Sequence, residues 1–201
     1  MGGRWWKGMD TREVFSIISA HQIKGLMLHS TWADYFAFLG LEGFKKLHEY
    51  RYVEESKSMR MIRRYFIEHY NELPIDISID SNLSEYVAQN TNNRFDVDNT
   101  TKERHIKLYL QGWVEWEKES KRLYENTYKT LSDNGEITGS CIVEKLVTDT
   151  DKELADAENL LLLATNVGFN MNVIILKQEK IKRDYDGKLK NFKFIGGNNE
   201  H

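Results

Sequence analysis

The chain contains 201 residues, of which 28 are Lys or Arg and 31 are Asp or Glu, so its formal net charge is −3 at pH 7. This balance gives no general electrostatic attraction to nucleic acid or to an anionic membrane, and the single cysteine, Cys141, excludes an internal disulfide framework. No apolar run approaches the roughly 20 residues of a membrane span, and the opening MGGRWWKG lacks the apolar core of a signal peptide. We therefore expect a cytoplasmic protein that does not bind membranes.

Apolar residues recur at helical spacing through most of the chain, and Pro74 is its only proline. This pattern predicts an all-α fold. The first helix is expected from Asp10, a capping residue, to Gly40, where a glycine ends it. The second is expected over residues 42 to 71, before Pro74.

Residues 73 to 99 break the helical period and are rich in Asn, Asp and Ser, as connections are. After this long connection, a third helix is expected over 100 to 132, a fourth over 138 to 167 and a shorter fifth from residue 170. Asp133-Asn134-Gly135 forms a compact turn between the third and the fourth.

Four helices of similar length, joined in pairs by tight turns, pack best as an antiparallel bundle. The connection between the two pairs is long enough to run back along the bundle, which predicts one long crossover. We expect a single domain over residues 10 to 190, preceded by an N-terminal arm (1 to 9) and followed by a flexible tail (191 to 201).

Polar residues interrupt the apolar stripe near the middle of each long helix. A buried carboxylate must be paired, protonated, solvated or bound to a metal. These polar residues are Gln22 and His29, then Glu55 and Ser58, then Glu117, and finally Asp149, Glu153 and Asp156.

The first helical pair also carries three short motifs: LGLEGF at 39 to 44, the adjacent carboxylates Glu54-Glu55, and NELP at 71 to 74. In these motifs it resembles the first helical pair of bacterial ferritins. The resemblance implies a ferritin-like bundle, and with it ferroxidase activity, iron storage and closed oligomeric shells.

The metal-ligand positions of the family are only partly kept. On an ungapped alignment Glu55 keeps the bridging glutamate, whereas Ser58 replaces the histidine ligand and Gln22 replaces the glutamate of the first helix. Glu117 is the best-placed ligand of the third helix, with Glu119 as the alternative if the helix is rotated. No Glu-x-x-His motif occurs in the chain, so the resemblance implies a degenerate di-metal site.

Two functions remain open. The first is a non-catalytic ferritin-like bundle that has lost the standard ferroxidase site, holds no cofactor, and acts through self-association or partner binding. The alternative is a protein that oxidises or stores iron or manganese at a non-standard, carboxylate-rich site. Its candidate metal ligands are Glu55, Glu117, Glu153, Asp156 and His29.

Partners are predicted from the two ends of the chain. The resemblance implies a homo-oligomer, and Trp5-Trp6 either dock on a neighbouring subunit or belong to a disordered arm. The lysines between 177 and 193 are interrupted by acidic residues, which indicates a solvated face rather than a surface for nucleic acid.

Overall fold

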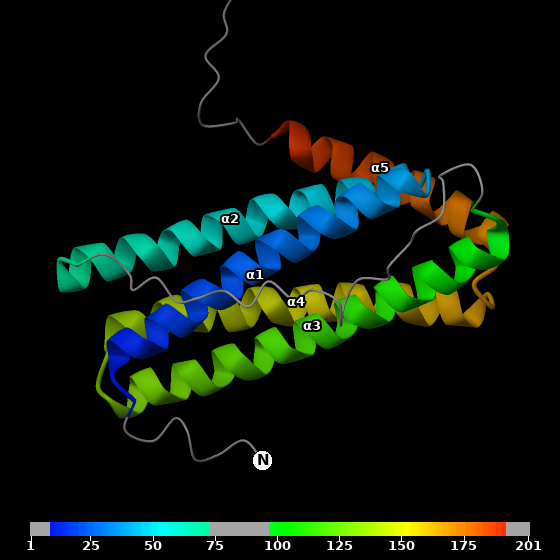
Figure 1. Ribbon diagram of the computed structural model, residues 1–201. Coiled ribbons are helices and arrows are strands. Elements are labelled where there is room, and N and C mark those ends of the chain that lie inside the picture. The colour runs from blue at the N-terminus through cyan, green and yellow to red at the C-terminus, as the bar shows by residue number, and fades with distance from the viewer. Residues whose placement is uncertain (1–8, 73–96, 192–201) are drawn as a thin grey trace, which may run out of the picture.

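The computed structural model describes residues 9–72 and 97–191, and these residues form five α-helices (Figure 1). The helices are α1 (Thr11–Phe38), α2 (Glu42–Tyr70), α3 (Asn99–Asp133), α4 (Ile137–Asn166) and α5 (Met171–Lys190). The predicted all-α class is confirmed. The extremities of the predicted arm and tail, residues 1–8 and 192–201, lie outside the described residues.

The helices pair as the turn lengths predicted. α1 packs against α2 and α3 against α4, each pair joined by a tight turn and running antiparallel, while α5 lies against α2 (Figure 1). The end of α2 and the start of α3 lie at opposite ends of the bundle, so the chain between residues 72 and 97 joins opposite ends, as predicted for one long crossover.

Short-range capping explains where the helices begin and end. The Asp10 side chain accepts a hydrogen bond from the backbone N–H of Arg12, and Gly40, at a φ of 75°, allows Leu41 N–H to bond back to the carbonyl of Phe36. The predicted start of the third helix at residue 100 is slightly late. Asp98 caps α3 instead, by accepting a hydrogen bond from Thr101 N–H at 2.7 Å.

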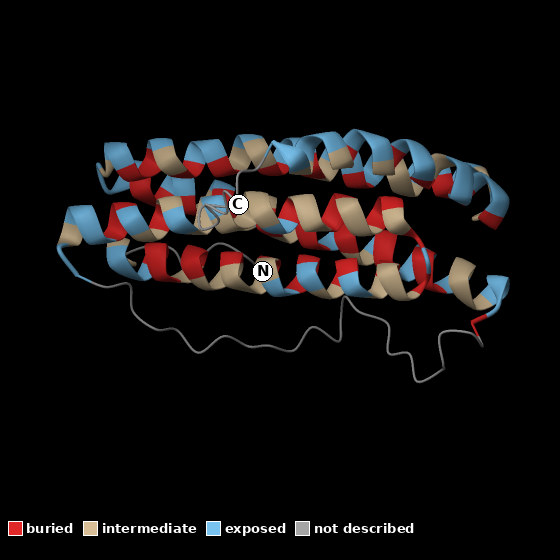
Figure 2. Cartoon of the chain, turned by 90° about the horizontal axis from the view of Figure 1, so that it is seen from above, coloured by how far each residue is buried: buried red, intermediate tan, exposed pale blue. Residues whose placement is uncertain are grey.

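Buried residues recur along each helix of the bundle (Figure 2), and the apolar ones among them form two clusters. One, around Trp32, Phe36 and Trp113, lies toward the turn between α1 and α2. The other, around Phe15 and Phe66, lies toward the first residues of α1 and the last residues of α2. Buried polar residues in the middle of the helices separate the two clusters.

The fifth helix contacts α2 so closely that its backbone touches Gly43. A Cβ atom built on Gly43 would lie 1.9 Å from the carbonyl oxygen of Gln178, and Gly43 N–H donates a 2.7 Å hydrogen bond to the Gln178 side chain. Only glycine fits at this crossing. None of the helices in the described part of the chain is long and apolar enough to cross a membrane.

Replacing Gly43 with alanine should separate α5 from α2, because the added methyl group would overlap the α5 backbone. We expect a loss of about 2–4 kcal/mol in the free energy of unfolding, together with faster amide hydrogen exchange in α5. Urea titration and hydrogen exchange measure the two effects.

Gly187→Ala is the matched control, since Gly187 lies on α5 and a Cβ there meets nothing within 4 Å. This variant should gain up to about 1 kcal/mol from helix propensity. Equal stability of the two variants would contradict the close crossing.

Candidate functional site

A polar centre lies between the two apolar clusters and is built from all four bundle helices. We use this name for Gln22 of α1, Arg51 and Glu55 of α2, Glu117 of α3, and Glu153 of α4. The apolar residues on either side hold these polar side chains at the middle of helices that are roughly 45 Å long.

Arg51 carries the positive charge of this centre. The guanidinium donates from one NH2 group to Glu153 Oε1 at 2.6 Å and from the other to Asp156 Oδ2 at 2.7 Å. Glu153 and Asp156 stand three residues apart on α4, so one planar fork reaches both carboxylates. Arg51 and Glu153 are buried, whereas the Asp156 side chain is half exposed. Burial lowers the pKa of Arg51, but Glu153 and the other neighbouring acidic groups raise it by more, which keeps Arg51 charged.

The other two carboxyl groups of the centre are held close to neutral. The Glu55 carboxyl lies over Gly25, where a built Cβ would be 3.5 Å from it, and burial and the charge of Glu153 raise the pKa of Glu55 to about 8. Burial and the neighbouring carboxylates also raise the pKa of Glu117 well above its usual range, although Trp113 Nε1–H donates to it at 2.8 Å.

Two opposing effects act on the pKa of Glu153. Burial raises its pKa and the adjacent Arg51 lowers it, with a net upward direction. The 2.6 Å contact is nevertheless the length of a charge-assisted hydrogen bond, so we assign Glu153 as the ionised partner of Arg51 at neutral pH. One cation and one anion then balance in the interior, and the raised pKa values of Glu55 and Glu117 favour their protonated forms.

His29 lies apart from the carboxyl groups and pairs with another histidine. Its Nδ1 is 3.1 Å from Nδ1 of His48, and the rings of Trp32, Phe36 and Trp113 surround the pair. Burial lowers the pKa of His29 to about 3 and that of His48 well below its usual range, so both rings are neutral and one Nδ1 donates to the other.

The remaining candidates are divided between interior and surface. Gln22 is buried, and its amide approaches Tyr124, yet neither amide atom has a hydrogen bond of normal geometry. Ser58 and Glu119 are partly exposed. Asp149 forms an ion pair with Lys152 at 3.2 Å on the outside of α4.

Sequence reasoning missed the role of Arg51. It stands four residues before Glu55 on the same helical stripe, and a charged residue on an otherwise buried stripe is the signal that could have identified it.

Several of the predicted metal ligands contact other side chains of the chain. Within residues 9–72 and 97–191, no three His, Cys, Asp or Glu side chains are arranged to hold a metal ion. Glu153 and Asp156 already accept from Arg51, His29 pairs with His48, and Gln22 is a neutral, weak ligand.

The fold is nevertheless that of ferritins. An engineered closed form of the ferritin of Archaeoglobus fulgidus superposes with a TM-score of 0.69 at 13% sequence identity, covering 86% of this chain and 94% of that chain. The open pore ferritin of the same archaeon superposes with a TM-score of 0.67 at 12% sequence identity, covering 86% of this chain and 94% of that chain. A humanized archaeal ferritin superposes with a TM-score of 0.69 at 14% sequence identity and the same coverage of both chains. No protein-family model and no curated protein sequence matches the chain. The predicted ferritin-like bundle is therefore confirmed as a fold.

Arg51→Met should destabilise the protein by about 3–5 kcal/mol at pH 7, because the change leaves Glu153 buried without its counter-charge. Adding Glu153→Gln to this variant should recover most of the lost stability. Thermal or urea unfolding of the single and double variants measures both changes.

Arg64→Met is the control for Arg51→Met. Arg64 makes an equally short 2.6 Å pair with Glu68 on the same helix, but in solvent, so its loss should leave stability almost unchanged. If both substitutions changed stability by a similar amount, burial of the Arg51 pair would contribute nothing to the stability of the protein.

Glu55→Gln should reduce the pH dependence of stability. The folded-state pKa of Glu55, about 8, lies above its usual value of 4.5, so the folded protein holds this proton more tightly than the unfolded chain does. Stability due to Glu55 is therefore complete below about pH 4.5 and is lost as pH rises through about 8. The variant should be more stable than the wild type at pH 9, by at most a few kcal/mol at about 1.4 kcal/mol per tenfold change in proton affinity.

The measurement is urea unfolding at several values between pH 5 and about 9. Glu54→Gln is the control, since Glu54 pairs with Lys57 on the outer side of the helix. Parallel pH profiles for the wild type and Glu55→Gln would contradict an enclosed Glu55 carboxyl group.

Proposed function

We infer that this chain is a non-catalytic ferritin-like subunit, in which an internal ion pair stands where the ferritin family holds its metals. In this proposal the standard ferroxidase site is lost, and the chain acts by associating with further copies of itself or with another protein. The observation that carries the proposal is the pair of hydrogen bonds from Arg51 to Glu153 and Asp156 inside the bundle.

A fixed guanidinium opposes metal binding in two ways. It neutralises the carboxylates that would attract a cation, and it repels the cation directly. A divalent ion about 4 Å from a guanidinium would be repelled by several kcal/mol at an effective dielectric constant of about 20. Metal binding at this place would also have to ionise Glu55 and Glu117, whose pKa values are raised in the folded protein.

The basic residues of α5 do not favour binding to nucleic acid. The Lys188 ammonium lies over the rings of Tyr185 and Tyr50, and Asp186 pairs with Lys46 across the α2–α5 contact. Part of the basic run is thus used within the chain, and a continuous stripe of free cations, which phosphate binding favours, is interrupted.

The alternative is iron or manganese storage or oxidation, and metal content separates the two functions. We expect the protein, purified without chelators and then incubated anaerobically with Fe(II) or Mn(II), to hold far less than one ion per chain after desalting. The wild type should also show no change in melting temperature with either metal, because a bound ion would stabilise the folded state.

Glu55→Ala and Glu54→Ala form the matched pair for this measurement, because the first removes a carboxyl group from the centre and the second removes one from the exterior. Near-stoichiometric metal in the wild type that is lost in Glu55→Ala and kept in Glu54→Ala would overturn the proposal and establish a carboxylate-rich metal site.

A further inference from the structure

A tyrosine and a histidine are hydrogen-bonded where the last turns of α1 meet the first turns of α3. The hydroxyl of Tyr35 bonds to Nδ1 of His105, and the two rings are tilted at 34° with their centres 5.6 Å apart. His105 is buried and Tyr35 is half-buried. Neither residue belongs to the polar centre, so the pair is a separate feature of the molecule.

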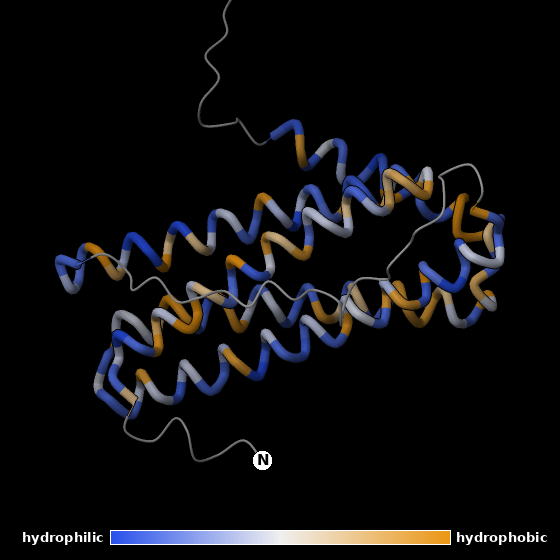
Figure 3. Tube along the Cα trace, in the orientation of Figure 1, coloured by the Kyte–Doolittle hydropathy of each residue, from blue (hydrophilic) through white to orange (hydrophobic). Residues whose placement is uncertain are grey.

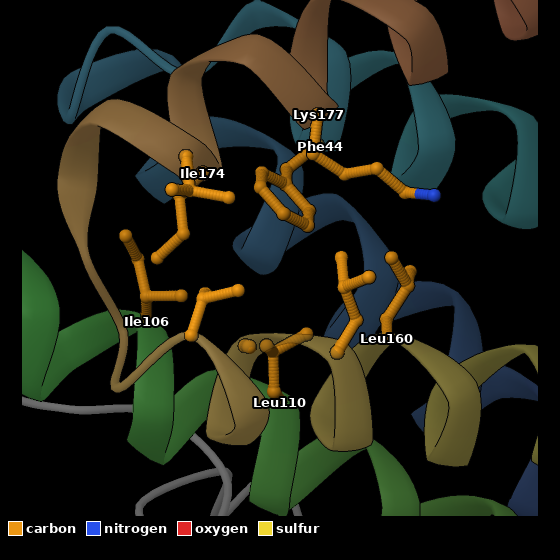
Figure 4. A pocket seen from close by; sticks show the side chains of 10 residues that line it. Phe44, Ile106, Leu110, Leu160, Ile174 and Lys177 are labelled. Carbon is orange, nitrogen blue, oxygen red and sulfur yellow. The ribbon is translucent and has the colours of Figure 1, made fainter.

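The packing of α3 holds His105 in place. Each helix carries both apolar and polar residues along its length (Figure 3), and the apolar neighbours of His105 on α3 are buried. Ile106 and Leu110 line a small apolar pocket together with Phe44 of α2 and Ile174 of α5 (Figure 4). These contacts fix the rotation of α3 about its axis, which directs the imidazole of His105 toward α1.

The pair has the chemistry of a proton donor and its acceptor. Burial, with a smaller contribution from the charge of Arg104, lowers the pKa of His105, so the ring is neutral at pH 7 and one of its nitrogens carries a lone pair. With the ring proton on Nε2, Nδ1 accepts the hydrogen bond from the Tyr35 hydroxyl. A neutral imidazole in this position can also take up the proton itself.

Other aromatic rings contact the ring of Tyr35. It stacks on Tyr109 with 4.6 Å between ring centres and on Phe38 with 5.7 Å. Tyr109 in turn lies edge-on to Trp32, with 6.4 Å between their centres. The face of an aromatic ring attracts positive charge, so these neighbours favour the loss of an electron from Tyr35.

We propose that Tyr35 is a redox-active residue that reduces one-electron oxidants, with His105 as its proton acceptor. A phenol that loses an electron becomes a very strong acid, so its oxidation at neutral pH is helped by a base within hydrogen-bond reach. The oxidant takes one electron from the Tyr35 ring, the O–H bond breaks, and the proton moves to Nδ1 of His105. The products are a neutral tyrosyl radical, an imidazolium and the oxidant reduced by one electron.

This activity goes beyond the proposed function and is independent of it, because it uses no side chain of the polar centre. Its substrate class is a small one-electron oxidant, which needs no binding pocket because an electron can leave a half-buried ring without direct contact. A buried histidine is required only as the proton acceptor.

Illumination of ruthenium(II) tris(bipyridine) with persulfate supplies such an oxidant, and electron paramagnetic resonance identifies the radical formed on the full-length protein. The parent protein for this measurement carries Tyr52→Phe, Tyr86→Phe and Tyr128→Phe. Tyr52 and Tyr128 are 44% and 38% exposed and would react with the oxidant directly, and Tyr86 lies outside the described residues. We expect a tyrosyl signal in this parent, and we expect Tyr35→Phe to remove most of it.

His105→Gln separates a proton acceptor from a packing contact. Glutamine keeps a hydrogen-bond acceptor for the Tyr35 hydroxyl but is not a base at neutral pH. Radical formation, followed by flash photolysis, should be slower by about tenfold or more in this variant. Its rate should also rise with the concentration of buffer base, whereas the rate in the parent should not.

Tyr65→Phe is the matched control, since the Tyr65 hydroxyl also has a partner within the chain, the carboxylate of Glu136. This change should leave the signal and the rate as they are in the parent, and circular dichroism checks that each variant is folded. The inference would be overturned by a parent without a tyrosyl signal, by a signal that survives Tyr35→Phe, or by equal rates in His105→Gln and the parent. Loss of the signal in Tyr65→Phe would also overturn it, and would assign the activity to the pair with Glu136. None of these results depends on metal binding, so failure here leaves the proposed function unchanged.

Discussion

The burial of carboxyl groups at the middle of the bundle is the constraint on which the rest of the structure depends. Unpaired charges cost several kcal/mol each in such surroundings, so the folded protein must either neutralise them or supply a cation. It does both. Arg51 pairs with Glu153 and Asp156, while Glu55 and Glu117 are held near neutrality by burial and by their charged neighbours. The polar centre is consequently stable only as a unit.

The two apolar clusters and α5 surround the polar centre. The cluster around Trp32 and Trp113 closes one side, and the cluster around Phe15 closes the other. α5 crosses α2 at Gly43 and brings Tyr185 close enough to Arg51 for the two to interact electrostatically. Packing of α5 therefore adds Tyr185 to the electrostatic surroundings of Arg51.

Much of the fold could be predicted from the sequence because local rules determine it. Apolar spacing indicated the five helices, Gly40 and Gly135 marked the ends of two of them, and turn lengths predicted the pairing. The positions of Glu55 and Glu117 were also predicted, since both lie on strongly apolar stripes. The start of α3 was misplaced because Asp98, two residues earlier, provides the cap.

The missed features depend on contacts between distant residues. The partners of Arg51 are more than 100 positions away, so its place on a buried stripe could indicate that it points inward but not which groups it contacts. The pairing of His29 with His48 depends on the facing of two helices, and the need for glycine at residue 43 depends on α5. The sequence-based expectation treated each carboxylate as a separate candidate ligand, whereas the structure shows Arg51 bonded to two of them, Glu153 and Asp156.

The use of arginine rather than lysine follows from the geometry of α4. Glu153 and Asp156 are one helical turn apart, and the two NH2 groups of one guanidinium reach both at 2.6 and 2.7 Å. An ammonium is a single point charge and could approach both only by leaving a longer contact with each. A guanidinium also stays protonated when buried, whereas burial lowers the pKa of a lysine. The forked, permanent cation Arg51 can therefore pair with both α4 carboxylates at the middle of this bundle.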